Sequence, residues 1–115
     1  MCSFATQHHT QNANKEWAGK RVLVAGLARS GLAAASLLLR AKAVPVLYDQ
    51  KGPENFGNEL NHLQQAGCVL ALQGDIQALV SQADVIVISP GIPMDSPLAV
   101  LANQMGIPCV GELEL

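Results

Sequence analysis

Short apolar runs of strand length alternate with runs of helical length, and this alternation constrains the fold more than any other feature. The apolar runs are residues 21–25, 44–48, 68–72, 85–88 and 107–110. The helical runs between and after them are residues 32–41, 58–66, 76–82 and 98–105. Strands that alternate with helices form parallel sheets through right-handed crossovers. The sequence therefore predicts an α/β domain with a doubly wound, five-stranded parallel sheet of the Rossmann type, in the order 3-2-1-4-5.

Composition agrees with this fold and excludes several functions. Half of the 115 residues are hydrophobic but only 3% are aromatic, so Val, Leu, Ile and Ala must build the core. A net charge of −2 argues against nucleic acid or an acidic membrane as the partner. Residues 1–16 are polar and lack the apolar stretch of a signal peptide. We expect a flexible tail over 1–16, one domain over 17–115, and a cytoplasmic location.

Two loops are expected to form a ligand site. Ligands of doubly wound sheets bind beyond the carboxyl ends of the strands, where the winding reverses. Here the reversal is predicted between strands 21–25 and 85–88, which are followed by the loops GLARSG (26–31) and SPGIP (89–93). We expect these loops to face each other across a crevice. The prolines of SPGIP stiffen the second loop, although they could also serve only to end the strand.

The GLARSG loop has the features of an anion site. Gly26 permits a tight turn after the strand, and Gly31 permits close packing of the following helix on the sheet. Ser30 places a hydroxyl beside the unpaired N–H groups of the helix start, where the helix dipole attracts anions. Arg29 can add a positive charge. The alternative is that the two glycines serve only the turn and the packing.

Known phosphate-binding motifs match this loop only in part. A Walker A motif requires Lys-Ser/Thr after its second glycine, and Leu32-Ala33 stand there instead. In the dinucleotide motif G-x-G-x-x-G, Ala28 replaces the middle glycine, which weakens the case for NAD. Asp49 ends the second strand at about the 20-residue offset of that motif. It could bind the ribose of NAD, bind the base or sugar of another nucleotide, or cap its own loop.

The chain resembles the N-terminal domain of the D-glutamate-adding members of the Mur ligase family, which act in peptidoglycan synthesis. The resemblance lies in GKRVLVAGLARSGLAAA, LYD and DVIVISPGIPMDSPLAVLANQMGIPCVGELEL, and it covers residues 19–115. It implies that this domain binds the UDP part of UDP-N-acetylmuramoyl-L-alanine. It also implies that ATP, Mg²⁺ and the acyl-phosphate chemistry belong to a central domain, and that D-glutamate is bound mainly by a C-terminal domain.

By position, the resemblance implies ten UDP-binding residues. Those expected at the diphosphate are Ala28, Arg29 and Ser30. Those expected at the uracil end are Asp49, Gln50 and Lys51. Those expected on the loop that flanks the nucleotide are Ser89, Pro90, Gly91 and Ile92. The sequence departs from the family pattern at Ala28, where the family usually has glycine, and at Gln50-Lys51, where Thr/Ser-Arg is common.

The chain stops at GELEL (111–115), where the family continues into its central domain. We find no Walker lysine, catalytic base or metal-ligand set in it, and the three histidines do not form one. We therefore expect a monomeric binding module that is inactive alone. Two alternatives remain open: an NAD(P)-binding domain of a dehydrogenase or nucleotide-sensing regulator, and a structural domain without a ligand.

Overall fold

The structure is a computed structural model that describes residues 17–27, 29–89, 92–93 and 95–111, and only the backbone of residues 29, 30 and 53. The expected tail over 1–16 lies outside the described residues, as do Ala28, Pro90 and Gly91. Within the described part of the chain, no helix is long and apolar enough to cross a bilayer.

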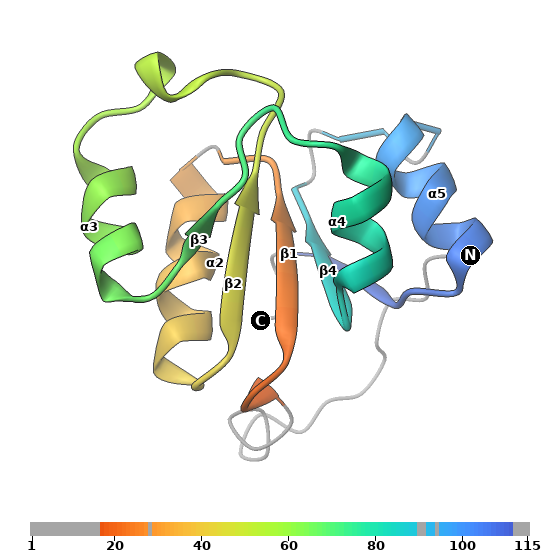
Figure 1. The fold of residues 1–115 in the computed structure, drawn as a ribbon, viewed down its shortest axis with the longest axis horizontal. Helices are drawn as coiled ribbons and strands as arrows, with labels where there is room; N and C mark the ends of the chain where they lie inside the picture. Colours follow the sequence, from red (N-terminus) through yellow and green to blue (C-terminus); the bar gives the residue numbers. More distant parts are fainter. Residues whose placement is uncertain (1–16, 28, 90–91, 94, 112–115) are drawn as a thin grey trace.

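The sheet has the predicted topology. Its strands are β1 (Arg21–Ala25), β2 (Val44–Tyr48), β3 (Val69–Leu70), β4 (Val85–Ile88) and β5 (Cys109–Gly111). They lie in the order β3-β2-β1-β4-β5, and every pair is parallel. Figure 1 shows β1 at the centre, between β2 and β4. The carboxyl ends of these three strands therefore lie together at one edge, where the winding reverses.

Helices cover both faces of the sheet. They are α2 (Arg29–Arg40), α3 (Glu59–Ala66), α4 (Ile76–Gln82) and α5 (Pro97–Met105), with a short 3₁₀ helix η2 (Pro53–Asn55). Figure 1 shows α2 beside α3 and α4 beside α5. Helix α5 begins with a typical cap: Ser96 is the N-cap, its hydroxyl accepts a hydrogen bond from the Ala99 N–H at 3.3 Å, and Pro97 follows in the first turn.

The core is aliphatic and lies in two layers, one on each face of β1. Val22 and Val24 point toward α2 and α3, whereas Leu23 and Ala25 point toward α4 and α5. All four are no more than 1% exposed. A strand that is buried on both faces needs apolar residues at successive positions. This explains why apolar and polar residues do not alternate in RVLVA.

Two strands are shorter at their starts than the sequence predicts. The Cys68 N–H donates to the Leu63 carbonyl at 2.9 Å, and the Ile107 N–H donates to the Ala102 carbonyl at 3.0 Å. These bonds close the ends of α3 and α5, so both residues belong to helix ends rather than to β3 and β5. β3 also ends early, because the chain turns at Gln73, whose φ is +59°. Apolar character at a helix end and in a strand cannot be distinguished by periodicity.

Candidate functional site

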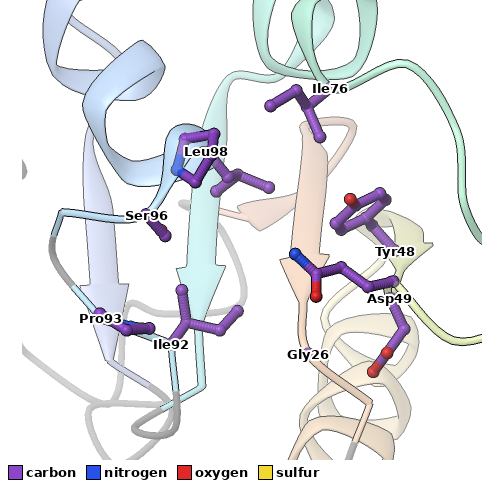
Figure 2. A pocket seen from close by; sticks show the side chains of 10 residues that line it. Gly26, Tyr48, Asp49, Ile76, Ile92, Pro93, Ser96 and Leu98 are labelled. Atoms are coloured by element: carbon purple, nitrogen blue, oxygen red, sulfur yellow. The ribbon is translucent and has the colours of Figure 1, made fainter.

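Among the described residues, two hollows that share Gly26 and Asp49 open where β1, β2 and β4 end. The first, called the α5 hollow, has a volume of about 250 Å³ (Figure 2). Its lining residues are Gly26, Tyr48, Asp49, Gln50, Ile76, Ile92, Pro93, Ser96, Pro97 and Leu98. The second, called the η2 hollow, has a volume of about 490 Å³. Its lining residues are Gly26, Leu27, Asp49, Lys51, Asn55, Phe56 and Ser89.

The Asp49 carboxylate fastens the loops after β1 and β2 to each other. Its Oδ2 accepts a hydrogen bond from the Leu27 N–H at 2.8 Å, and its Oδ1 accepts one from the Lys51 N–H at 2.9 Å. Both are charge-assisted bonds, which are stronger than bonds between neutral groups. The Asp49 carbonyl also accepts from the Gln73 N–H at 2.8 Å. This geometry shows that Asp49 caps its own loop, which is one of the three roles that the sequence leaves open.

Gly26 is required by its backbone angle and by its neighbour. Its φ is +94°, a region that side chains rarely tolerate. A Cβ added there would lie 2.7 Å from the Ser89 Cβ. The Ser89 N–H also donates to the Ala25 carbonyl at 3.0 Å. The loops that leave β1 and β4 therefore meet at Gly26 and Ser89, as the sequence predicts for loops that face each other.

The described part of the SPGIP loop begins with a buried serine. Ser89 is 8% exposed. The Ile92 N–H donates to the Ser89 carbonyl at 3.0 Å. Figure 2 shows Ile92 and Pro93 on the same wall of the α5 hollow as Ser96 and Leu98. This loop thus borders both hollows, Ser89 the η2 hollow and Ile92 the α5 hollow.

The other described residues expected at the UDP site lie in the two hollows or at the start of α2. Gln50 lines the α5 hollow and Lys51 lines the η2 hollow, and both are exposed. Arg29 and Ser30 are the first two residues of α2. The structure thus brings Asp49 to the boundary of the two hollows and places its two neighbours on either side.

Sequence reasoning missed residues that line the hollows without a motif. Tyr48 is the last residue of β2, and its half-buried side chain stands across the α5 hollow from Ile92 (Figure 2). Burial raises the pKa of the Tyr48 hydroxyl above its usual 10.0, and the adjacent Asp49 carboxylate raises it further. Phe56 lines the η2 hollow. An aromatic residue in an otherwise polar loop is the one signal that could have indicated it.

Comparison with protein families gives one match over most of the chain. The family described as "Mur ligase MurD-like, N-terminal domain" matches residues 20–111. A UDP-N-acetylmuramoylalanine–D-glutamate ligase of Acidobacterium capsulatum is 38% identical over 100 residues, which are 87% of this chain and 22% of that protein. The enzyme of that name from Pelotomaculum thermopropionicum is 40% identical over 101 residues, 88% of this chain and 22% of that protein. The chain thus spans about a fifth of the length of these relatives.

Solved structures share the fold at low sequence identity. A pseudomurein peptide ligase type C from Methanothermus fervidus superposes with a TM-score of 0.63 and 22% identity, covering 80% of this chain and 19% of that one. The D-lactate dehydrogenase from Escherichia coli superposes with a TM-score of 0.60 and 22% identity. The superposition covers 83% of this chain and 29% of that one. At this identity both likenesses concern the fold alone.

The close approach at Gly26 predicts a large loss of stability in Gly26→Ala. The new methyl group would meet Ser89, and the backbone would be strained at positive φ. We expect the free energy of unfolding to fall by about 2–5 kcal/mol, measured by urea denaturation with Trp17 fluorescence. Gly106→Ala is the matched control, since Gly106 has a φ of +72° but nothing within 4 Å of its added Cβ. It should lose only about 1–2 kcal/mol. Equal losses in the two variants would show that the contact with Ser89 is unimportant.

The position of Tyr48 predicts a displaced titration. Tyr48 is the only tyrosine of the sequence, so phenolate absorbance reports this residue alone. We expect its midpoint above pH 10.0, and a lower midpoint in Asp49→Asn that still exceeds 10.0 because burial remains. A raised pKa in the folded state means that this group's contribution to stability is lost as the pH rises through the midpoint. A midpoint below 10.0, or one unchanged by Asp49→Asn, would contradict this assignment of causes.

Proposed function

The chain belongs to the Mur ligase MurD-like N-terminal domain family, and from this premise we propose that it binds the UDP part of UDP-N-acetylmuramoyl-L-alanine. In this proposal it serves a cytoplasmic, monomeric enzyme that joins D-glutamate to that substrate with ATP. The observation that carries the proposal is the site itself: two hollows converge at the reversal of the sheet in a domain of this family. Such reversals are where doubly wound domains bind nucleotides.

The diphosphate is proposed to lie at the start of α2. Arg29 and Ser30 are its first two residues, and Ala28 precedes them in the sequence. The unpaired N–H groups and the dipole of a twelve-residue helix favour negative charge there. Lys51, which lines the adjoining η2 hollow, adds a positive charge on the same side of Asp49. A diphosphate would thus be held by backbone donors and by cations, without a Walker lysine.

The uridine is proposed to lie against the loop after β2. Asp49, Gln50 and Lys51 form this loop, and Ser89, Pro90, Gly91 and Ile92 flank the nucleotide from the loop after β4. Each Asp49 carboxylate oxygen accepts one backbone hydrogen bond and retains capacity for another. Asp49 can therefore fix the loop and still accept a hydrogen bond from a base or sugar.

An NAD(P)-binding role has less support. The capacity that Asp49 retains for a sugar hydroxyl would serve NAD as well as UDP, so Asp49 does not favour NAD(P) over UDP. Ala28 also replaces the glycine that allows close approach of a pyrophosphate in the dinucleotide motif. The superposition with D-lactate dehydrogenase reflects the shared sheet topology and adds no cofactor evidence.

The ligation itself is assigned to other parts of the full-length enzyme. ATP, Mg²⁺ and D-glutamate are proposed to bind there, as the family resemblance implies, and no residue of this chain is given a catalytic or metal-binding role. The part played by this domain is to hold the nucleotide end of the substrate. The rest of the substrate then projects away from the sheet edge.

Titration with UDP and with NADH tests this proposal. We expect UDP to shift the amide resonances of Leu27, Lys51 and Ser89 in NMR spectra, and NADH to have at least tenfold lower affinity. Lys51→Glu should weaken UDP binding by about tenfold, because an attractive charge becomes repulsive. Lys20→Glu, at the exposed position before β1 and so at the opposite edge of the sheet, should leave it unchanged. Tighter binding of NADH than of UDP, or equal effects of the two lysine variants, would refute the proposed function.

A further inference from the structure

Charge is divided unequally between the two edges of the sheet. Among the described residues, five of the six carboxylates follow a strand or precede or begin a helix at the edge of the candidate site: Asp49, Glu54, Glu59, Asp75 and Asp95. Four of the six described cations stand at the opposite edge, where the strands begin: Lys20, Arg21, Arg40 and Lys42. We call these four residues the basic edge. The sixth described carboxylate, Asp84, lies there too, so four positive charges face one negative charge.

The four cations of the basic edge lie close together. The Val44 N–H, two residues after Lys42, donates to the Lys20 carbonyl at 2.8 Å, and Arg21 is the register partner of Val44. Arg40 is the last residue of α2. Figure 1 shows the starts of β1 and β2 beside the end of α2. Within the described structure none of the four side chains has an ion pair or a hydrogen bond, and all but that of Arg21 are exposed.

The dipoles of the helices do not account for this cluster. A cation near the end of a helix is stabilised by the helix dipole, and this applies to Arg40 in the last turn of α2. However, α3, α4 and α5 end at the same edge without a basic residue in the last turn. Lys20 and Arg21 precede and begin a strand. The cations are therefore gathered at one place on the edge instead of being spread over the helix ends.

Lys42 has a backbone conformation that favours glycine. Its φ is +69°. Its N–H donates to the Leu39 carbonyl, and the next N–H donates to the Leu38 carbonyl, each at 3.0 Å, which is the Schellman pattern of a helix end. The same pattern ends α3 and α5 at Gly67 and Gly106. A lysine at this position strains the backbone, and what it adds is a cation at the centre of the basic edge.

The shape of the basic edge suits a flat partner. None of its residues lines the α5 hollow or the η2 hollow. β1 and β2 are each paired on both sides, so a peptide cannot add to them as a further strand. The Lys20 N–H donates to the carbonyl of the half-buried Trp17 at 3.0 Å. Tryptophan beside lysine and arginine is typical of surfaces that meet the headgroups of a bilayer.

The net charge of −2 does not oppose such a partner, because the charges are separated. The five residues of β1 place the two edges about 16 Å apart, which is twice the Debye length of ~8 Å at physiological salt. The carboxylates of the site edge are thus screened from a surface that touches the basic edge. We propose that the basic edge binds the anionic surface of a lipid bilayer, with the candidate nucleotide site facing the solution.

Vesicle co-sedimentation tests this proposal. The probes are vesicles of phosphatidylcholine alone and vesicles of equal parts phosphatidylcholine and phosphatidylglycerol. We expect half of the protein to bind the anionic vesicles at on the order of 1 mM accessible anionic lipid, and none to bind the neutral ones. Salt at ~1 M should abolish the binding. Trp17 is the only tryptophan of the sequence, and its emission should move to shorter wavelength because it lies beside the contact.

Matched variants locate the contact. Lys42→Gly should weaken vesicle binding about fivefold, the contribution of one cation near a bilayer, without lowering the melting temperature, since its φ suits glycine. Lys51→Gln removes a cation from the other edge and should leave vesicle binding unchanged. Gln73→Gly replaces the other described non-glycine residue of positive φ, +59°, without a change of charge, and should also leave it unchanged. Lys20→Gln repeats the test if Lys42→Gly does not fold.

Three results would overturn the proposal. The first is equal binding to the neutral and the anionic vesicles. The second is an equal loss of binding in Lys42→Gly and Lys51→Gln, which would make the net charge responsible and not the basic edge. The third is tighter binding of polyglutamate than of the anionic vesicles, which would make an acidic protein the partner. No nucleotide is used, so the outcome is independent of the proposed function.

Discussion

The contact between the ends of β1 and β4 is the constraint on which the site depends. Gly26 and Ser89 approach so closely that a side chain at Gly26 has no room. This approach brings the loops after β1 and β4 together where the winding of the sheet reverses. The Asp49 carboxylate joins the loop after β1 to the loop after β2. Three loops from three strands are thereby fixed relative to one another before any ligand arrives. Such preorganisation reduces the entropy lost on binding.

The same arrangement divides the edge of the sheet into two environments. On one side of Asp49 lie Lys51 and the start of α2, which favour negative charge. On the other side lie aliphatic side chains, the Tyr48 hydroxyl and the start of α5, where Pro97 has no N–H and the Ala99 N–H donates to the Ser96 hydroxyl. The half-buried Asp49 carboxylate, which accepts a backbone hydrogen bond on each oxygen, lies between the two environments.

Sequence predicted the fold well because its signals were local. Apolar runs of strand length and runs of helical length each depend on a few neighbouring residues, and the topology follows from their alternation. The starts of β3 and β5 were placed too early, because Cys68 and Ile107 are apolar yet hydrogen-bonded to helix ends. The secondary-structure propensity of a residue does not predict which carbonyl its backbone N–H will bond to.

The site was predictable only to the level of which loops meet. Sequence indicated GLARSG, Asp49 and SPGIP, but not that Asp49 binds Leu27 and Lys51, since such bonds depend on three-dimensional distances. Nor could it indicate that Gln50 and Lys51 line different hollows, because the direction of a loop side chain has no periodicity.

The most direct test of the account is a crystal structure of this chain with UDP. The account predicts the diphosphate at the start of α2, the uridine against the loop of Asp49, and the Asp49–Leu27 hydrogen bond intact. It would be contradicted by UDP bound away from this edge of the sheet, for example in the groove between α2 and α3 that Ser36 and His62 line. It would equally be contradicted by a complex in which Asp49 releases Leu27 to reach the ligand.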